Sequence, residues 1–130
     1  MNRQFHILVA DRNRHVRELL RRELLVEGYS VQLAKDSEEV MAIIEGCRVP
    51  DLLILDPEIP NPSGISMLEM LSERIPPLPV VVHTLEADAG DSVSQNIVAA
   101  FIEKSGDTNK LKHLILQVLE EFYPHRFRQI

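Results

Sequence analysis

Hydrophobic residues fall into short apolar runs that alternate with stretches of helical spacing. The runs at 5–10, 52–55, 79–82 and 99–102 are almost continuously apolar, which is typical of strands covered on both faces. The run at 29–34 alternates apolar and polar positions, as expected for a half-covered strand nearer a sheet edge. The pattern therefore predicts five strands.

Between and after these strands, apolar residues recur at the three- and four-residue spacing of amphipathic helices. Gly28 ends the first helix, and Asp36 or Ser37 caps the second. Residues 85–98 carry only a weak helical pattern and are expected to form a short helix after a polar loop. The four clearer helices are predicted at 14–27, 37–47, 64–75 and 111–122.

Alternating strands and helices predict an α/β fold, a doubly wound five-stranded parallel sheet of order 2-1-3-4-5. With helices on both faces, this is a flavodoxin-like three-layer sandwich. A chain of 130 residues suits one domain. We expect that domain at residues 1–122, followed at 123–130 by a C-terminal tail or the start of a linker.

Composition narrows the classes of function. The chain is 45% hydrophobic and 26% charged, an ordinary globular mixture. A net charge of −6 argues against direct binding of nucleic acid or an anionic membrane. No apolar run reaches the ~18 residues of a membrane span, and residues 5–10 are too short for an export signal. A cytoplasmic location is expected, and the single cysteine, Cys47, excludes an internal disulfide.

Four predicted strands end in or before a polar residue, namely Asp11, Asp56, Thr84 and Lys104. Because carboxyl ends of parallel strands meet at one edge, we expect these side chains to converge. Each alone suits an ordinary helix cap or loop, but together they indicate a site. A carboxylate can act as a nucleophile, and an ammonium and a hydroxyl can hold the resulting acyl phosphate. A divalent cation normally screens the repulsion in such chemistry.

The segments ILVAD, DLLILDPEIPNPSG, PVVVHT and AAFIEKSG, in this order, resemble the receiver domain of two-component response regulators. The resemblance covers roughly residues 5–122. It implies that Asp56 is the phosphoacceptor. It also implies that Asp11 belongs to the acidic pocket for Mg²⁺, with the backbone carbonyl of Glu58 as a further metal ligand.

The resemblance also implies a switch, with Thr84 and Phe101 as the switch pair and Lys104 as the phosphate-binding lysine. The expected function is signalling in a phosphorelay, without a freestanding enzymatic activity. The phosphodonor would be a histidine kinase or a phosphotransfer protein. A second subunit or an output partner would bind through residues 85–122, and residues 85–98 are expected to be the most mobile internal segment.

Three residues depart from the family pattern. Arg12 stands where the family has a second metal-binding acid, so the pocket becomes formally neutral with Arg12 pointing inward. Such a pocket should hold Mg²⁺ poorly. Arg12 either points to solvent or pairs with Asp56, an attraction of up to about 4 kcal/mol. Leu85 replaces a small residue and is expected to narrow access, and Ser105 replaces a proline and is expected to alter the loop before the last helix.

Two further interpretations remain open. One is a pseudo-receiver, an interaction module that keeps the fold without metal-dependent phosphorylation. The other is a flavin carrier on the same sheet, which is disfavoured because the charged segment DRNR follows the first strand where a small phosphate-cradling loop is needed. The first helix also carries a basic side, formed by Arg14, Arg17, Arg21 and Arg22. This side is either a solvated face or a contact surface for the phosphodonor.

Overall fold

The computed structural model describes residues 4–62, 64, 67–74, 76–85 and 98–127. The strands form one five-stranded sheet of order β2-β1-β3-β4-β5, and every neighbouring pair is parallel. This confirms the predicted topology and the edge position of the second strand. The strands are β1 His6–Ala10, β2 Ser30–Ala34, β3 Leu52–Leu55, β4 Val80–Thr84 and β5 Val98–Glu103.

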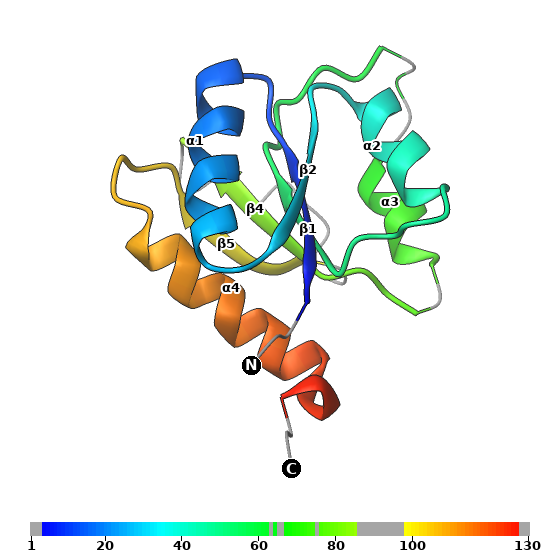
Figure 1. Cartoon of the computed structure of the whole chain (residues 1–130). Helices are drawn as coiled ribbons and strands as arrows, with labels where there is room; N and C mark the ends of the chain where they lie inside the picture. The colour runs from blue at the N-terminus through cyan, green and yellow to red at the C-terminus, as the bar shows by residue number, and fades with distance from the viewer. Residues whose placement is uncertain (1–3, 63, 65–66, 75, 86–97, 128–130) are drawn as a thin grey trace.

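Helices cover both faces of this sheet (Figure 1). One hydrophobic cluster joins one face to α1 and α4, and a second joins the other face to α2 and α3. All four residues of β3 are buried, as its continuous apolar run predicts. The helices are α1 Arg14–Val26, α2 Ser37–Ile44, α3 Met67–Ser72 and α4 Asn109–Phe122.

Three helices differ from the prediction by two residues or more. The second helix, expected at 37–47, ends at Ile44. The third helix, expected at 64–75, is described only over Met67–Ser72, and Gly64 at its predicted start has a left-handed φ of +69° that does not fit a helix. The last helix begins two residues earlier than predicted, at Asn109. The helix and the mobility expected at 85–98 fall on residues 86–97, which lie outside the described part, so both stay predictions.

Local capping fixes α1 behind the end of β1. The Asn13 side chain accepts hydrogen bonds from the backbone N–H groups of His15 and Val16. At the other end Gly28 has φ +96°, and the N–H groups of Gly28 and Tyr29 bond back to Leu25 and Leu24. A helix held at both ends positions the short loop between β1 and α1, which carries Asp11 and Arg12.

Residues 123–127, for which the sequence left open a free end or a linker, pack against the amino ends of β1 and β3. The hydroxyl of Tyr123 donates to the carbonyl of Asp51 at 2.7 Å, and burial raises the pKa of Tyr123 to about 12. The Arg126 guanidinium forms an ion pair with Asp51 at 2.8 Å and lies 4.1 Å above the Phe5 ring. Phe127 stacks on the same ring. Residues of the segment 123–127 thus contact the domain. The predicted domain boundary at residue 122 stays a prediction.

Candidate functional site

The four polar residues predicted at strand ends gather at one edge of the sheet. Asp11 follows β1, Asp56 follows β3, Thr84 closes β4 and Lys104 follows β5. The first three are only 1%, 2% and 3% exposed. The Lys104 ammonium lies 2.9 Å from Asp11 Oδ2 and 3.6 Å from Asp56 Oδ2, and its backbone N–H donates to the Thr84 carbonyl. The predicted convergence is confirmed.

Asp56 is held by the turn that follows β3. Its Oδ1 accepts the backbone N–H of Glu58 at 3.0 Å, and its Oδ2 accepts the backbone N–H of Arg12 at 3.2 Å. The N–H of Ile59 bonds back to the Asp56 carbonyl. Hydrogen bonds from main-chain donors favour the ionised carboxylate. The buried strand can end in a carboxylate because backbone N–H groups and the side chains of Arg12 and Lys104 compensate its charge.

Asp11 is fixed by residues that the sequence alone did not single out for this role. Its Oδ1 accepts the backbone N–H of Asn13 at 2.8 Å, and its backbone carbonyl accepts from the Arg17 guanidinium at 2.7 Å. Oδ2 is fully buried and meets the Lys104 ammonium. Arg17 therefore braces the loop of Asp11, and it is not available as part of a free basic face on α1.

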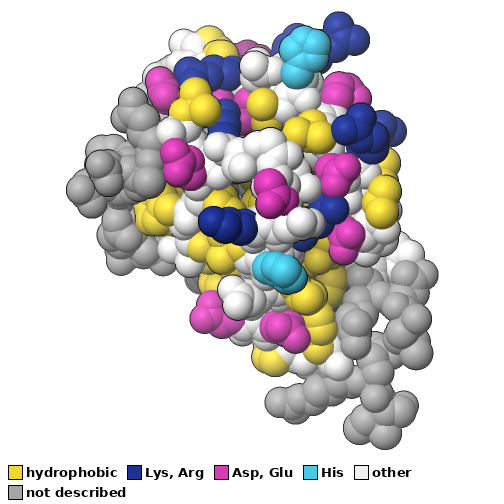
Figure 2. Space-filling view, turned by 90° about the vertical axis from the view of Figure 1, so that its left-hand side faces the viewer, with side chains coloured by type: hydrophobic (Ala, Val, Ile, Leu, Met, Phe, Trp, Pro, Cys, Tyr) yellow, Lys and Arg dark blue, Asp and Glu magenta, His cyan; other side chains and the backbone are white. Residues whose placement is uncertain are grey.

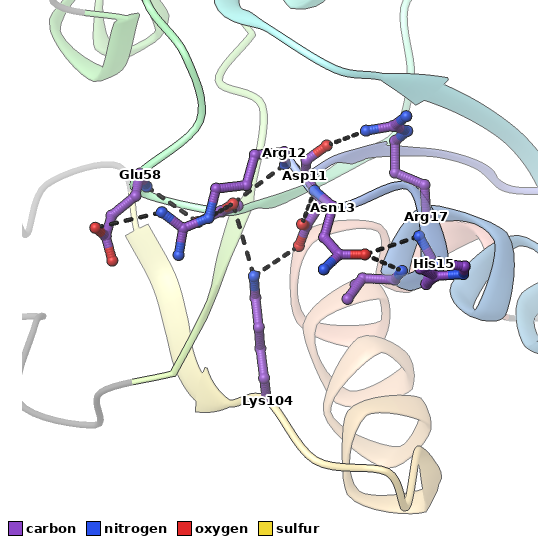
Figure 3. A network of polar contacts seen from close by, with 9 residues as sticks. Asp11, Arg12, Asn13, His15, Arg17, Glu58 and Lys104 are labelled. Carbon is purple, nitrogen blue, oxygen red and sulfur yellow. Dashed lines mark hydrogen bonds and ion pairs between the residues drawn. The ribbon is translucent and has the colours of Figure 1, made fainter.

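The Arg12 side chain points into the pocket. Its Nε lies 3.4 Å from Asp56 Oδ2, and its Nη1 lies 3.4 Å from Glu58 Oε1, so it extends between the two carboxylates (Figure 3). The expectation that Arg12 pairs with Asp56 is confirmed, and the solvent-pointing alternative is wrong. Because Arg12 is 38% exposed and Glu58 62% exposed, water screens these pairs. Their contribution is closer to about 1 kcal/mol than to the 4 kcal/mol upper bound.

The residues as placed do not fit a divalent cation well. Mg²⁺ requires several oxygen ligands in near-octahedral geometry. Here Asp56 Oδ2 already faces two side-chain cations and an N–H, and Asp11 Oδ2 faces the Lys104 ammonium. Among the described residues, no three His, Cys, Asp or Glu side chains form a group that could hold a metal. The role of the Glu58 carbonyl as a ligand stays a prediction.

The expected switch pair occupies one face of the sheet. Phe101 lies opposite Val82 in the β4–β5 register and packs partly buried against the cluster under α2 and α3. Thr84 is two residues beyond Val82 on β4, so strand alternation places it on that same face. Leu85 is exposed, and the Ser105 hydroxyl accepts the N–H of Asp107 in the following loop.

His83 is a further buried polar residue near the site, and the sequence did not assign it a role there. It is 5% exposed, and its Nδ1 has no hydrogen-bond partner among the described residues. Burial, and then the nearby Lys104 ammonium, lower the pKa of His83 to about 4. The imidazole is therefore neutral at pH 7 and adds no charge to the pocket.

The order of the strands defines a flavodoxin-like domain, and its site is a pocket of two buried aspartates and a lysine at the carboxyl ends of the strands. The family model of the response regulator receiver domain matches residues 7–116. The chain therefore belongs to the response regulator receiver domain family. Receiver domains are signalling domains, they interact with histidine kinases, and they typically bind Mg²⁺ at the phosphorylation site.

Similar proteins agree with this assignment. The response regulator MprA of Mycolicibacterium vanbaalenii is 42% identical over 91 residues, which cover 70% of this chain but 37% of that protein. The response regulator TrrA of Thermotoga maritima, solved with Mg²⁺ and BeF, is 30% identical with a TM-score of 0.74, covering 92% of this chain and 100% of that one. A structure of the histidine kinase ThkA in complex with TrrA matches with a TM-score of 0.71 and 28% identity, covering 92% and 99%.

The face formed by α1 and α4 carries charges of both signs. Basic and acidic side chains lie next to each other across it (Figure 2). Arg22 lies 3.9 Å from Glu23, and Lys112 of α4 forms ion pairs with Glu23 of α1 and with Glu27, the residue that follows α1. The acidic side chains therefore offset part of the positive charge expected on α1 from its sequence.

No helix within the described ranges is long and apolar enough to span a membrane.

Proposed function

We propose that this receiver domain accepts a phosphoryl group on Asp56 from a histidine kinase or a phosphotransfer protein. The observation that carries the proposal is the placement of Asp56 Oδ2, which lies 3.4 Å from Arg12 Nε and 3.6 Å from Lys104 Nζ. A nucleophilic carboxylate that has cations beside it can receive an anionic group without uncompensated repulsion. Among the described carboxylates, Asp56 combines this with the end of a strand buried on both faces.

Each residue of the pocket has a part in this reaction. Asp56 supplies the attacking oxygen, and Lys104 neutralises charge on the phosphoryl oxygens. Asp11 holds Lys104 in position through the 2.9 Å ion pair. The Thr84 hydroxyl would move toward the phosphoryl group, and Phe101 would follow into the space released. That movement would change the surface of β5 and α4 that faces partners.

The partners follow from the same proposal. The complex of ThkA with TrrA supports a histidine kinase as the phosphodonor. A homodimer or an output partner would use residues 85–122. The chain spans about 37% of the length of the MprA relative. The proposal therefore concerns the receiver domain, and any output partner is proposed with it.

Arg12 supports a second candidate, a pseudo-receiver that binds partners without being phosphorylated. Its guanidinium stands beside Asp56 in the position where the family places a metal-binding acid. If this ion pair blocks the incoming group, Asp56 is a fixed structural carboxylate. The fold and the partner surface would then function without a covalent switch.

Phosphotransfer from a phosphohistidine donor distinguishes the two. A histidine kinase autophosphorylated with labelled ATP is mixed with the wild-type domain and with Asp56→Asn. The phosphorelay proposal expects label on the wild type and none on Asp56→Asn. Label that survives Asp56→Asn would rule out Asp56 as the acceptor. If several kinases and small phosphodonors all leave the wild type unlabelled, the pseudo-receiver is correct.

A further inference from the structure

Both side-chain cations of the pocket lie beside one oxygen atom, Asp56 Oδ2. It lies 3.4 Å from Arg12 Nε and 3.6 Å from Lys104 Nζ, and it accepts the Arg12 backbone N–H at 3.2 Å. The two buried aspartates are thus matched by two side-chain cations of the chain itself. The formal charges of these four groups sum to zero, and the nearby Glu58 carboxylate, which also contacts Arg12, is 62% exposed and screened by water.

We propose that the Arg12 guanidinium serves as a built-in cation, so that phosphoryl transfer to Asp56 proceeds without a divalent metal. This rests on the proposed function, since it specifies how the same carboxylate is phosphorylated. Arg12 is then a catalytic residue, because it contacts the nucleophilic oxygen and would contact the phosphoryl group. The signalling state would depend on the phosphodonor and not on the supply of Mg²⁺.

The chemistry of arginine fits this role. A guanidinium stays protonated and presents several N–H donors in a planar fork that matches two oxygens of a phosphoryl group. A phosphoryl group on Asp56 Oδ2 would have Arg12 on one side and Lys104 on the other, because both already flank that atom. Fixed cations aimed at developing charge are the usual source of rate enhancement in phosphoryl transfer.

Arg12 is also free to adjust as the phosphoryl group arrives. Its side chain is 38% exposed, whereas that of Lys104 is 10% exposed. The contact of Arg12 Nη1 with Glu58 Oε1 is solvent-screened and easily exchanged for a phosphoryl oxygen, because Glu58 is 62% exposed. Glu58 therefore restrains Arg12 in the resting state without locking it over Asp56.

The proposed step balances without any other reactant. An Asp56 carboxylate oxygen attacks phosphorus and a new O–P bond forms. The P–N bond of phosphohistidine breaks and its electron pair stays on the ring nitrogen. Because the other ring nitrogen of the donor is already protonated, the histidine leaves as a neutral imidazole. With acetyl phosphate the P–O bond breaks instead and acetate leaves. Arg12 and Lys104 keep their protons and act through charge and hydrogen bonds.

The test compares labelling with and without metal. Wild type, Arg12→Gln and Arg12→Lys are incubated with acetyl phosphate or phosphoramidate, in excess EDTA or in Mg²⁺, and followed by intact mass. Arg21→Gln is the matched control, because it removes the same charge from an exposed residue of α1. We expect wild type and Arg21→Gln to be labelled equally in EDTA and in Mg²⁺. In EDTA, Arg12→Gln should be labelled on the order of a hundredfold more slowly than wild type, and the rate of Arg12→Lys should lie between these two.

Each other outcome has a definite meaning. Labelling of the wild type only with Mg²⁺ overturns the built-in cation and leaves Asp56 as a phosphoacceptor. Equal labelling of Arg12→Gln and wild type in EDTA assigns the metal-free rate to other groups and also overturns it. No labelling in either buffer overturns this inference, and transfer from the autophosphorylated histidine kinase then decides the proposed function separately. Circular dichroism of each variant verifies the fold, and a Mg²⁺ titration followed by amide NMR shifts reads metal binding independently of the reaction.

Discussion

We expect the residue at position 12 to determine whether the pocket binds Mg²⁺. Arg12→Asp removes a positive charge beside Asp56 Oδ2 and adds a carboxylate ligand, changing the formal charge by two units. We expect this variant to bind Mg²⁺ at least about tenfold more tightly than wild type, because octahedral oxygen ligation becomes possible. Isothermal titration calorimetry measures the affinity.

Arg21→Asp serves as the control for long-range charge, since it makes the same charge change on the exposed side of α1. Its Mg²⁺ affinity should stay close to that of wild type. If the wild type already binds Mg²⁺ as tightly as Arg12→Asp, the guanidinium leaves the pocket in solution and the charge argument is wrong.

His83 makes stability depend on pH. Its pKa is lowered from 6.5 to about 4 in the folded domain, so the unfolded chain takes up a proton first as the pH falls. Stability from this residue is complete above pH 6.5 and is lost progressively between pH 6.5 and about 4. The loss amounts to up to about 3 kcal/mol.

Urea unfolding at several pH values measures this effect. His83→Gln should flatten the pH dependence between 6.5 and 4, whatever its effect on stability at neutral pH. His113→Gln, at an exposed position of α4, should keep the wild-type slope. An unchanged slope in His83→Gln would mean that the imidazole is solvated and titrates normally.

At the scale of elements, the end of the chain stabilises the base of the sheet. The Arg126 guanidinium donates from Nη1 to Asp51 Oδ1 at 2.8 Å and from Nη2 to the Gln4 carbonyl at 2.8 Å, and it covers the Phe5 ring. Arg126→Ala should lower the free energy of unfolding by about 1–2 kcal/mol. The measurement is chemical denaturation.

Arg22→Ala is the matched control for this change, because Arg22 is 71% exposed and has one long ion pair at 3.9 Å. Its effect should stay within about 0.5 kcal/mol. Equal stability of Arg126→Ala and wild type would show that residues 123–127 do not hold the base in solution.

Elements with a strong local pattern were predictable, and those that depend on distant contacts were not. The continuous run of β3 and the capped α1 follow from residues next to one another. The third helix was predicted too long because its apolar spacing extends back to Gly64, whose φ of +69° is not helical. The contacts of Tyr123 and Arg126 join residues far apart in the sequence, and no local pattern indicates them.

For the whole molecule, topology accounts for most of the site. Parallel strands of order 2-1-3-4-5 bring Asp11, Asp56 and Lys104 to one edge, so their convergence could be predicted without side-chain coordinates. The direction of Arg12 could not, because a residue in a loop can turn to solvent or inward at similar cost. The inward direction depends on two carboxylates that lie more than forty positions away, Asp56 and Glu58.

The chemical identity of the phosphorylated residue tests the central claim most directly. The domain is phosphorylated with acetyl phosphate, reduced with borohydride to convert an aspartyl phosphate to homoserine, and digested for tandem mass spectrometry. We predict homoserine at position 56 and at no other aspartate. Homoserine at position 11, or a reduced glutamate at position 58 with Asp56 intact, would contradict the assignment of Asp56 as the acceptor.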